Sequence, residues 1–515
     1  MLCLTLVMLW SLTISVTMAQ PTDAMRVEIS SRSLNKSHHV EILGNDGLML
    51  FFESNELSDQ GERKWYFSLY STRLEEKWIR YVLLKDGLVF NKAIRSGGSL
   101  HFLFSVKDSK KSQQPAFQMI IYQLANEQFN LLGGPLQAGA EIKAFEIVNH
   151  HALIFMQVKN EVELITVNLA NAQVTAKPSG IEGQAVIQTS AVNHKAGEVM
   201  LALKKYNAGR YTSEVFITFN QHGQKRHQTD YQSDRSEFLH TYLIHPTDDG
   251  VYIITGCYEQ NDRKRAKLKD DQNDLQNDTH GFFFLAVSSK GLITENFIEL
   301  KNFDNLHSSL TSAELMKSRQ RKSKSAKKDR RISLSFQFFN PVLIKTNEHY
   351  VFSVEAFRPR YRTETRMDYD FYGRPIPYTY NVFDGFEFFA GVVNGFDSSG
   401  QLVWNNNLEM RDLISFEMNG HFNAFPDPDG MLLSYVGFGK IVSKMINQSG
   451  TIGQSEQLKI ESKHASDRLQ AEDNAILRHW HDRYYLATGY QKIINNRLRD
   501  DATRTVFYMN KIILE

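Results

Sequence analysis

Two segments in the second half of the chain concentrate side chains suited to binding another molecule. The first, residues 317–331, holds nine Lys or Arg residues against Asp329, a net charge of +8. Such a run can hold a polyanionic surface by releasing its counterions, but a self-repelling, solvated loop is the simpler interpretation. No aromatic residue interleaves with the charges, so the run gives no specific signal for nucleic acid. Its candidate binding residues are Lys322, Lys324, Lys327 and Lys328.

The second segment, residues 358–384, is rich in Arg and Tyr. These types dominate binding hot spots, because they supply rigid area and planar hydrogen-bond donors. Exposed aromatic rings there could also stack on sugars. The alternative is a loop folded over its own domain with the rings packed inward. The candidate binding residues are Arg358, Arg360, Tyr361, Arg362, Tyr369, Tyr372, Arg374 and Tyr378.

Motifs for catalysis, metal ions or cofactors are not found. The sequence holds no Gly-x-Ser-x-Gly, no Gly-x-x-x-x-Gly-Lys and no His-Glu-x-x-His. The pair His479 and His481 has no placed third ligand, so it does not predict a zinc site. No metal and no cofactor are therefore predicted. Carboxylates brought together from separate strands would leave no motif, so a hydrolase stays open.

The amino-acid composition alone limits which classes of fold are possible. The chain has 515 residues, of which 42% are hydrophobic and 12% aromatic, so a sizeable core can form and global disorder is excluded. The formal charge of +1 gives no overall field that favours nucleic acid or an acidic surface. Abundant aromatic residues favour strands.

The first residues predict export. Residues 1–20 are apolar and free of acidic residues, and the small residues Thr17 and Ala19 fit a signal peptide spanning 1–19. A membrane anchor is the alternative, weakened by the Ser and Thr residues that interrupt the run. We expect a mature chain without a transmembrane anchor, located in the periplasm, at the cell surface or outside the cell. Cys3 would be removed, and Cys257 alone cannot form an intramolecular disulfide.

A short turn recurs along the chain and defines its organisation. It consists of an apolar residue, Asp or Asn, two variable residues and Gly, as in Phe396–Gly400, Phe219–Gly223 and Ile446–Gly450. Asx side chains and Gly at positive φ are typical of hairpin turns. An apolar run lies on each side of such turns, and we count eight hairpins. Weaker strands flank each hairpin, which gives four antiparallel strands per unit.

This pattern resembles β-propeller repeat proteins, from about residue 25 to residue 515. Asp397, Gly400 and Trp404 resemble one copy of the docking motif of quinoprotein-type propellers, and the blades are WD-like in general form. The adjacent-cysteine pair of many quinoprotein dehydrogenases is missing, so no quinone cofactor is implied. The resemblance implies an all-β fold, a single propeller over residues 20–515 with eight blades, or seven as the alternative. Two β-sandwich domains would need a linker that the sequence does not provide.

The expected strand at residues 25–29 can complete the last blade, which otherwise lacks a fourth strand at Glu515. Insertions are expected at residues 259–280, 303–331 and 358–384. In an up-and-down sheet their connections all emerge at one end of the blades, and the tight Asx–Gly turns are expected at the other. Long loops often carry function, so the insertion end is the predicted working face.

The sequence thus favours an exported, non-catalytic propeller, expected to be monomeric, that binds a protein or a polymer such as a glycan or polyanion at the insertion face. The alternative is a propeller glycan hydrolase with carboxylates around the central axis.

Overall fold

The computed structural model describes residues 25–31, 38–106, 109, 114–233, 237–260, 279–300, 303, 336–447, 450–451, 453–498 and 502–514. The predicted signal peptide lies outside these residues, as do most of the expected insertions 259–280 and 303–331. Across the described residues, no helix is long and apolar enough to cross a membrane.

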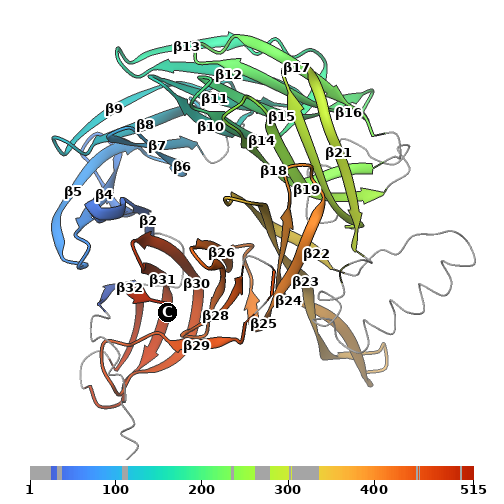
Figure 1. The fold of residues 1–515 in the computed structure, drawn as a ribbon. Coiled ribbons are helices and arrows are strands. Elements are labelled where there is room, and N and C mark those ends of the chain that lie inside the picture. The colour runs from blue at the N-terminus through green and yellow to red at the C-terminus, as the bar shows by residue number, and fades with distance from the viewer. Residues whose placement is uncertain are drawn as a thin grey trace, which may run out of the picture.

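The strands form eight four-stranded antiparallel sheets arranged around a common axis (Figure 1). The first four sheets consist of β2 (His38–Ile42), β3 (Leu48–Leu57), β4 (Glu62–Tyr70), β5 (Glu76–Lys85); β6 (Leu88–Ser96), β7 (Ser99–Val106), β8 (Ala116–Gln123), β9 (Gln128–Pro135); β10 (Ala140–Val148), β11 (His151–Val158), β12 (Glu161–Asn168), β13 (Gln173–Pro178); β14 (Gln184–Asn193), β15 (Glu198–Asn207), β16 (Arg210–Asn220) and β17 (Lys225–Tyr231). The next three consist of β18 (Glu237–Pro246), β19 (Tyr252–Gln260), β20 (Gly281–Ser288), β21 (Gly291–Glu299); β22 (Gln337–Lys345), β23 (Tyr350–Tyr369), β24 (Pro375–Phe396), β25 (Leu402–Ser415); β26 (Phe422–Asp427), β27 (Gly430–Gly437), β28 (Lys440–Asn447) and β29 (Glu456–Lys459). One short 3-10 helix, η1 (Gly44–Asp46), joins β2 to β3.

The eighth sheet joins the two ends of the chain. It contains β30 (Arg468–His481), β31 (Tyr484–Ile494), β32 (Thr503–Ile513) and, as its fourth strand, β1 (Arg26–Ser30). The β1 strand pairs antiparallel with β32, from Arg26 opposite Asn510 to Ser30 opposite Val506. The fold is therefore an eight-bladed β-propeller closed by its N-terminal strand, as predicted, and the seven-blade alternative is excluded.

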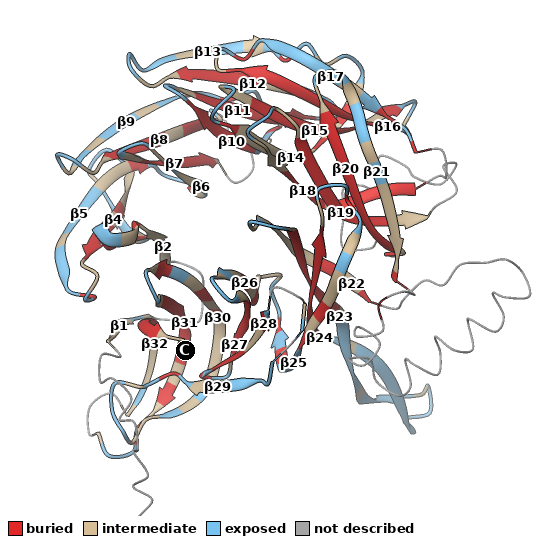
Figure 2. Ribbon diagram, in the orientation of Figure 1, coloured by how far each residue is buried: buried red, intermediate tan, exposed pale blue. Residues whose placement is uncertain are grey.

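Each blade buries its middle strands between its neighbours. The run Phe282–Leu285 on β20 is fully buried, because the blades on both sides cover it. Outermost strands such as β17 are largely exposed, and Figure 2 shows this change from red to blue across the blades. In the described residues, every one of the eight boundaries between adjacent blades holds an apolar cluster. The core is thus a ring, which explains the long apolar runs of the middle strands.

The innermost strands carry a repeated irregularity. A register shift interrupts β6, β10, β14, β18, β22 and β30. Asn340 on β22 and Asn474 on β30 adopt positive φ at these points. Such bulges bend a strand and change the direction of its side chains.

Candidate functional site

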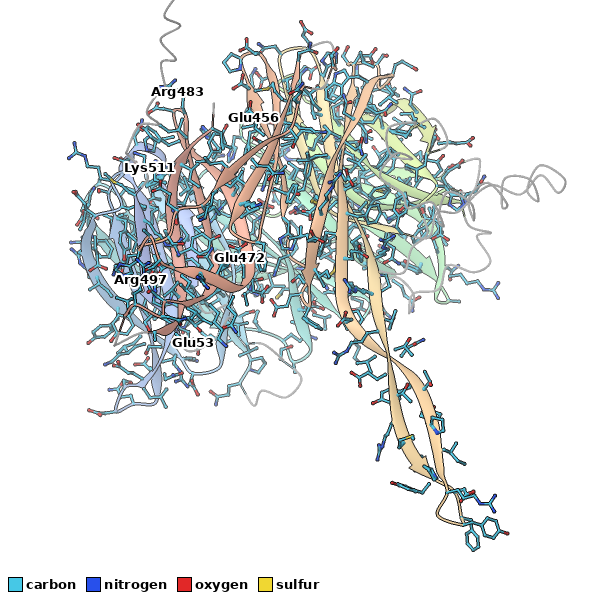
Figure 3. The ribbon with its side chains drawn as sticks, turned by 90° about the horizontal axis from the view of Figure 1, so that it is seen from below. Glu53, Glu456, Glu472, Arg483, Arg497 and Lys511 are labelled. Atoms are coloured by element: carbon cyan, nitrogen blue, oxygen red, sulfur yellow. The ribbon has the colours of Figure 1, made fainter. Side chains whose placement is uncertain are left out.

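The longest hairpin among the described residues, formed by β23 and β24, leaves the propeller as a two-stranded ribbon (Figure 3). β23 pairs with β22 only between Tyr350 and Phe357, and β24 pairs with β25 only between Phe386 and Phe396. Beyond these points Tyr361–Tyr369 pairs with Pro375–Phe383 alone, within the described part of the chain. We call residues 361–383 the ribbon.

The ribbon corrects the expected insertion at 358–384. The segment is not an irregular loop but a continuation of the blade's own middle hairpin. Its three prolines, Pro359, Pro375 and Pro377, argue against a central strand, yet a strand with no neighbour on one side tolerates proline. The alternative of a loop folded over its own domain with inward rings is wrong, because the rings are exposed.

The tip of the ribbon is a tight Asx–Gly turn. Asp370 Oδ1 accepts hydrogen bonds from the backbone N–H groups of Tyr372 (2.9 Å) and Arg374 (2.8 Å). Gly373 N–H donates to the Asp370 carbonyl at 2.9 Å, and Gly373 has φ +75°. The run Tyr369–Gly373 matches the repeated turn of the other hairpins. This match was the sequence feature that could have identified the ribbon.

Exposed apolar side chains gather at this tip. The exposed fractions are 98% for Phe371, 81% for Tyr372 and 69% for Tyr369. Other large hydrophobic side chains more than a third exposed along the ribbon are Tyr361, Met367, Ile376, Tyr378, Tyr380 and Phe383. Met367 and Ile376 were missed by the sequence argument, which looked for Tyr and Arg. Contiguous exposed apolar surface of this kind marks interaction sites.

Ion pairs at the base of the ribbon occupy most of the predicted arginines. Arg358 Nε lies 2.9 Å from Glu387 Oε2, and its guanidinium carbon lies 5.3 Å from the centre of the Phe389 ring. Arg360 Nε lies 3.2 Å from Asp384 Oδ2, and Arg362 Nη2 lies 2.7 Å from Glu364 Oε1. These side chains shape the ribbon, whereas Arg374 lies beside the Tyr372 ring at 5.9 Å.

The described flanks of the three expected insertions lie at one end of the blades. Tyr258 pairs with Gly281 and Gly281 with Glu299, which places the ends of the β19–β20 connection beside the end of β21. Across the blade boundary, the Phe282 ring lies 5.4 Å from Phe338, near the start of β22. The ribbon leaves from this same end. Lys322, Lys324, Lys327 and Lys328 lie outside the described residues.

The tight turns are not confined to the other end. Asp397–Gly400 follows the far end of β24 and Asn447–Gly450 the far end of β28, as expected. However, Ser58–Gly61 joins β3 to β4, and Asp370–Gly373 closes the ribbon, both at the insertion end. The turn is a general solution for closing these hairpins, so its position does not separate the two faces.

Two of the buried carboxylates are held by neighbouring residues. Glu146 on β10 accepts from Lys92 Nζ of β6 (3.1 Å) and from Ser190 Oγ of β14 (2.7 Å), so it ties three innermost strands together. Glu355 on β23 is fully buried, and burial raises its pKa to about 8. The described residues hold no group of three or more His, Cys, Asp or Glu side chains suited to a metal ion.

Glu355 was not among the site residues predicted from the sequence. Its hydrogen bonds connect two adjacent blades. Its Oε1 accepts from Asn340 Nδ2 (2.7 Å) and from the backbone N–H groups of His421 (2.8 Å) and Phe422 (3.0 Å). Phe422 begins β26, the innermost strand of the next blade. The hydrogen bonds thus fix the chain where it crosses from one blade to the next.

The fold is assigned from the order and pairing of the strands, and not from similarity to known proteins. No family model matches the sequence, and no curated protein matches it. Among solved structures, the chain is similar to the polysaccharide lyase Uly1, with 9% identity, 82% of this chain and 90% of that chain covered, and a TM-score of 0.39. It is also similar to the β-propeller domain of the trilobed protease from Pyrococcus furiosus, with 8% identity, coverage of 79% and 93%, and a TM-score of 0.35. A prolyl endopeptidase gives 8% identity, coverage of 90% and 55%, and a TM-score of 0.40.

Proposed function

We propose that this chain is an exported, non-catalytic β-propeller that binds a protein partner through the tip of its ribbon. The observation that carries the proposal is the exposed apolar cluster Tyr369, Phe371 and Tyr372, held on a ribbon that projects from the insertion end. Apolar side chains that project into solvent are uncommon unless they bind in a pocket of another molecule. The apolar N-terminal run of residues 1–20 supports export.

The chemistry of the tip favours a protein over a polysaccharide. Phe371, Met367 and Ile376 have no side-chain hydrogen-bond donor, whereas a glycan surface is dense in hydroxyl groups that need polar partners. Protein pockets, in contrast, are lined mainly by apolar side chains around a few polar groups. Hydrolysis is less well supported, because Glu146 and Glu355 are taken up by contacts within the ring.

Photo-cross-linking in the cells that make the protein tests this proposal. Phe371 is replaced by photoreactive p-benzoylphenylalanine, and Ile293, which is 58% exposed on the outermost strand β21, receives the same replacement as a matched control. We expect one discrete protein adduct from position 371 and none from position 293. The adduct should weaken when Tyr372→Ala is added, since each hot-spot ring contributes about 1 kcal/mol or more. Equal adducts from both positions, or none from position 371, would overturn the proposal.

A further inference from the structure

One edge of the ribbon is open for pairing with another strand. In the described residues, Tyr361–Tyr369 of β23 has a partner strand on its β24 side only. The other side of this stretch presents backbone N–H and C=O groups without a ladder. Such an edge is a template for strand addition, and a two-stranded ribbon by itself is only marginally stable in water.

The two edges of the ribbon are not equivalent. Pro375 and Pro377 lie on β24 and supply no N–H, which blunts that edge. Between Tyr361 and Tyr369 the β23 strand contains no proline. A strand that adds to the ribbon is therefore expected on the β23 side.

The β23 edge is complementary to itself. When two copies are placed antiparallel about a two-fold axis at Thr365, residue 364 faces residue 366 and residue 362 faces residue 368. This pairs Glu364 with Arg366 and Arg362 with Asp368, each pair occurring twice. Arg362 and Glu364, which contact each other within one copy at 2.7 Å, would exchange that contact for these partners in the second copy. Thr365 then faces itself, and Tyr361 faces Tyr369. Opposite charges and paired aromatic rings are the cross-strand partners that stabilise a sheet.

Neighbouring registers lose this complementarity. An axis at residue 364 places Glu364 opposite itself and Arg362 opposite Arg366, whereas an axis at residue 366 places Arg366 opposite itself and Glu364 opposite Asp368. A parallel, in-register pair would set every charge against its own copy. Like charges directly opposite one another are destabilising. Of these arrangements, the antiparallel pair centred on Thr365 is the one in which only opposite charges face each other.

We propose that a second copy of this chain pairs with the β23 edge, antiparallel and centred on Thr365, to form a two-fold symmetric dimer. The contact is isologous, so it closes after two copies. Because the ribbons project away from the propellers (Figure 3), the two rings would lie at opposite ends of a shared four-stranded sheet. The sequence-based expectation of a monomer is the alternative. The inference uses the edge of the ribbon and does not depend on the protein partner proposed for its tip.

Charge reversal tests the register. In sedimentation velocity over a range of protein concentrations, we expect the purified chain to dimerise. Arg362→Asp sets two pairs of like charges opposite each other and should raise the dissociation constant at least tenfold. The double variant Arg362→Asp/Asp368→Arg restores opposite charges and should restore the dimer. Lys195→Glu, a reversal at an exposed ion pair on another blade, is the control and should leave dimerisation unchanged.

Cysteine trapping tests the position of the axis. In a Cys3→Ser background, where the remaining Cys257 is buried, Thr365→Cys should give a disulfide-linked dimer on mild oxidation. Thr379→Cys is the matched control, because Thr379 pairs with Thr365 inside the ribbon. Two copies of residue 379 would lie three strand spacings apart, about 14 Å, too far for a disulfide.

The proposed pairing would be overturned if the chain stays monomeric at all concentrations, or if Arg362→Asp leaves the dimer intact. Trapping at residue 379 but not at residue 365 would do the same. A dimer without any adduct from position 371 would remove the proposed function and keep this inference, so the two failures are distinguishable.

Discussion

Glu355 shows how one buried carboxyl can serve the architecture rather than chemistry. Its side chain is enclosed, and only one of its two oxygens receives hydrogen bonds from the described residues. Burial raises its pKa to about 8, although Asn340 and two backbone N–H groups favour the ionised form. The carboxyl is therefore largely protonated at neutral pH. Folding at this position takes up a proton, which makes stability depend on pH.

Glu355→Gln should remove that dependence. The group has an ordinary pKa of 4.5 and a raised pKa of about 8 in the fold, so its stabilising effect is complete below 4.5 and is lost as the pH rises toward 8. Across this window it contributes a fall of about 1.4 kcal/mol per pH unit in the free energy of unfolding. A Gln side chain keeps one oxygen for the same three donors and cannot ionise. Urea unfolding at several pH values should give a flatter profile for the variant than for the wild type. Identical profiles would contradict the assignment.

Two glycines separate backbone strain from packing. Gly373 and Gly400 close similar turns at φ +75° and +80°, but a Cβ at Gly373 meets nothing within 4 Å, whereas one at Gly400 would overlap the Phe284 ring. Gly373→Ala should therefore cost only the positive-φ strain, about 1 kcal/mol. Gly400→Ala should add an overpacking penalty of about 1 to 3 kcal/mol. Chemical denaturation of both variants checks this, and equal losses would show that the turn relaxes around Phe284.

At the scale of elements, the strands were largely predictable and the ribbon was not. Middle strands such as β20 lie between two blades, so their side chains are apolar on both faces and the run is visible in the sequence. The ribbon buries little apolar surface, so its sequence shows no pattern of core-facing residues, and Pro375 and Pro377 are unfavourable in most strands. The Asp370–Gly373 turn was the available sign, because it matches turns already recognised at Asp397 and Asn447.

The ribbon should be separable from the propeller. Replacing residues 363–381 by Asn-Gly joins Arg362 to Val382, which are already directly opposite each other, through a favoured two-residue hairpin turn. The removed side chains are mostly exposed, so the free energy of unfolding should change by less than about 1 kcal/mol. Denaturant unfolding of the shortened chain measures this. A loss of several kcal/mol would show that the ribbon packs on the described body or on a segment outside it.

At the scale of the whole molecule, the ring is closed by one blade that contains strands from both ends of the chain, and we call the contact between β1 and the rest of this blade the joint. That β1 closes the last blade was predictable, because the C-terminal unit lacked a strand and the N-terminus offered one. The polar network that fastens it was not, because its members come from β1, β32 and the segment before β30. Arg504 Nε donates to Glu28 Oε2 at 3.0 Å and its Nη2 to Asp467 Oδ2 at 2.5 Å, and Arg26 Nε donates to Glu28 Oε1 at 2.7 Å.

Breaking this joint should loosen the entire ring. Burial opposes ionisation of Asp467, but hydrogen bonds from Arg504 and Asn495 outweigh it and lower its pKa to about 2. The Asp467 side chain is fully buried and that of Glu28 is 5% exposed, so Arg504→Met leaves both carboxylates short of a partner. We expect a loss of about 3 kcal/mol in the free energy of unfolding at neutral pH. Arg63→Met, which breaks the half-exposed pair with Asp86, is the matched control and should cost less than about 1 kcal/mol.

The pH dependence of the free energy of unfolding in acid gives a second test of the same joint. Because the pKa of Asp467 is lowered in the fold, its contribution is present above its ordinary value of 3.8 and is lost as the pH falls toward 2. Without Arg504 that pKa should rise, so the variant should lose less stability than the wild type over this range, and the two unfolding curves should converge in acid. If the wild type and Arg504→Met instead differ by a constant amount down to acid pH, the ion pair is not what fastens β1. Closure would then rest on the β1–β32 ladder and on the apolar contacts of Val27 and Ile29 with the cluster around Trp480.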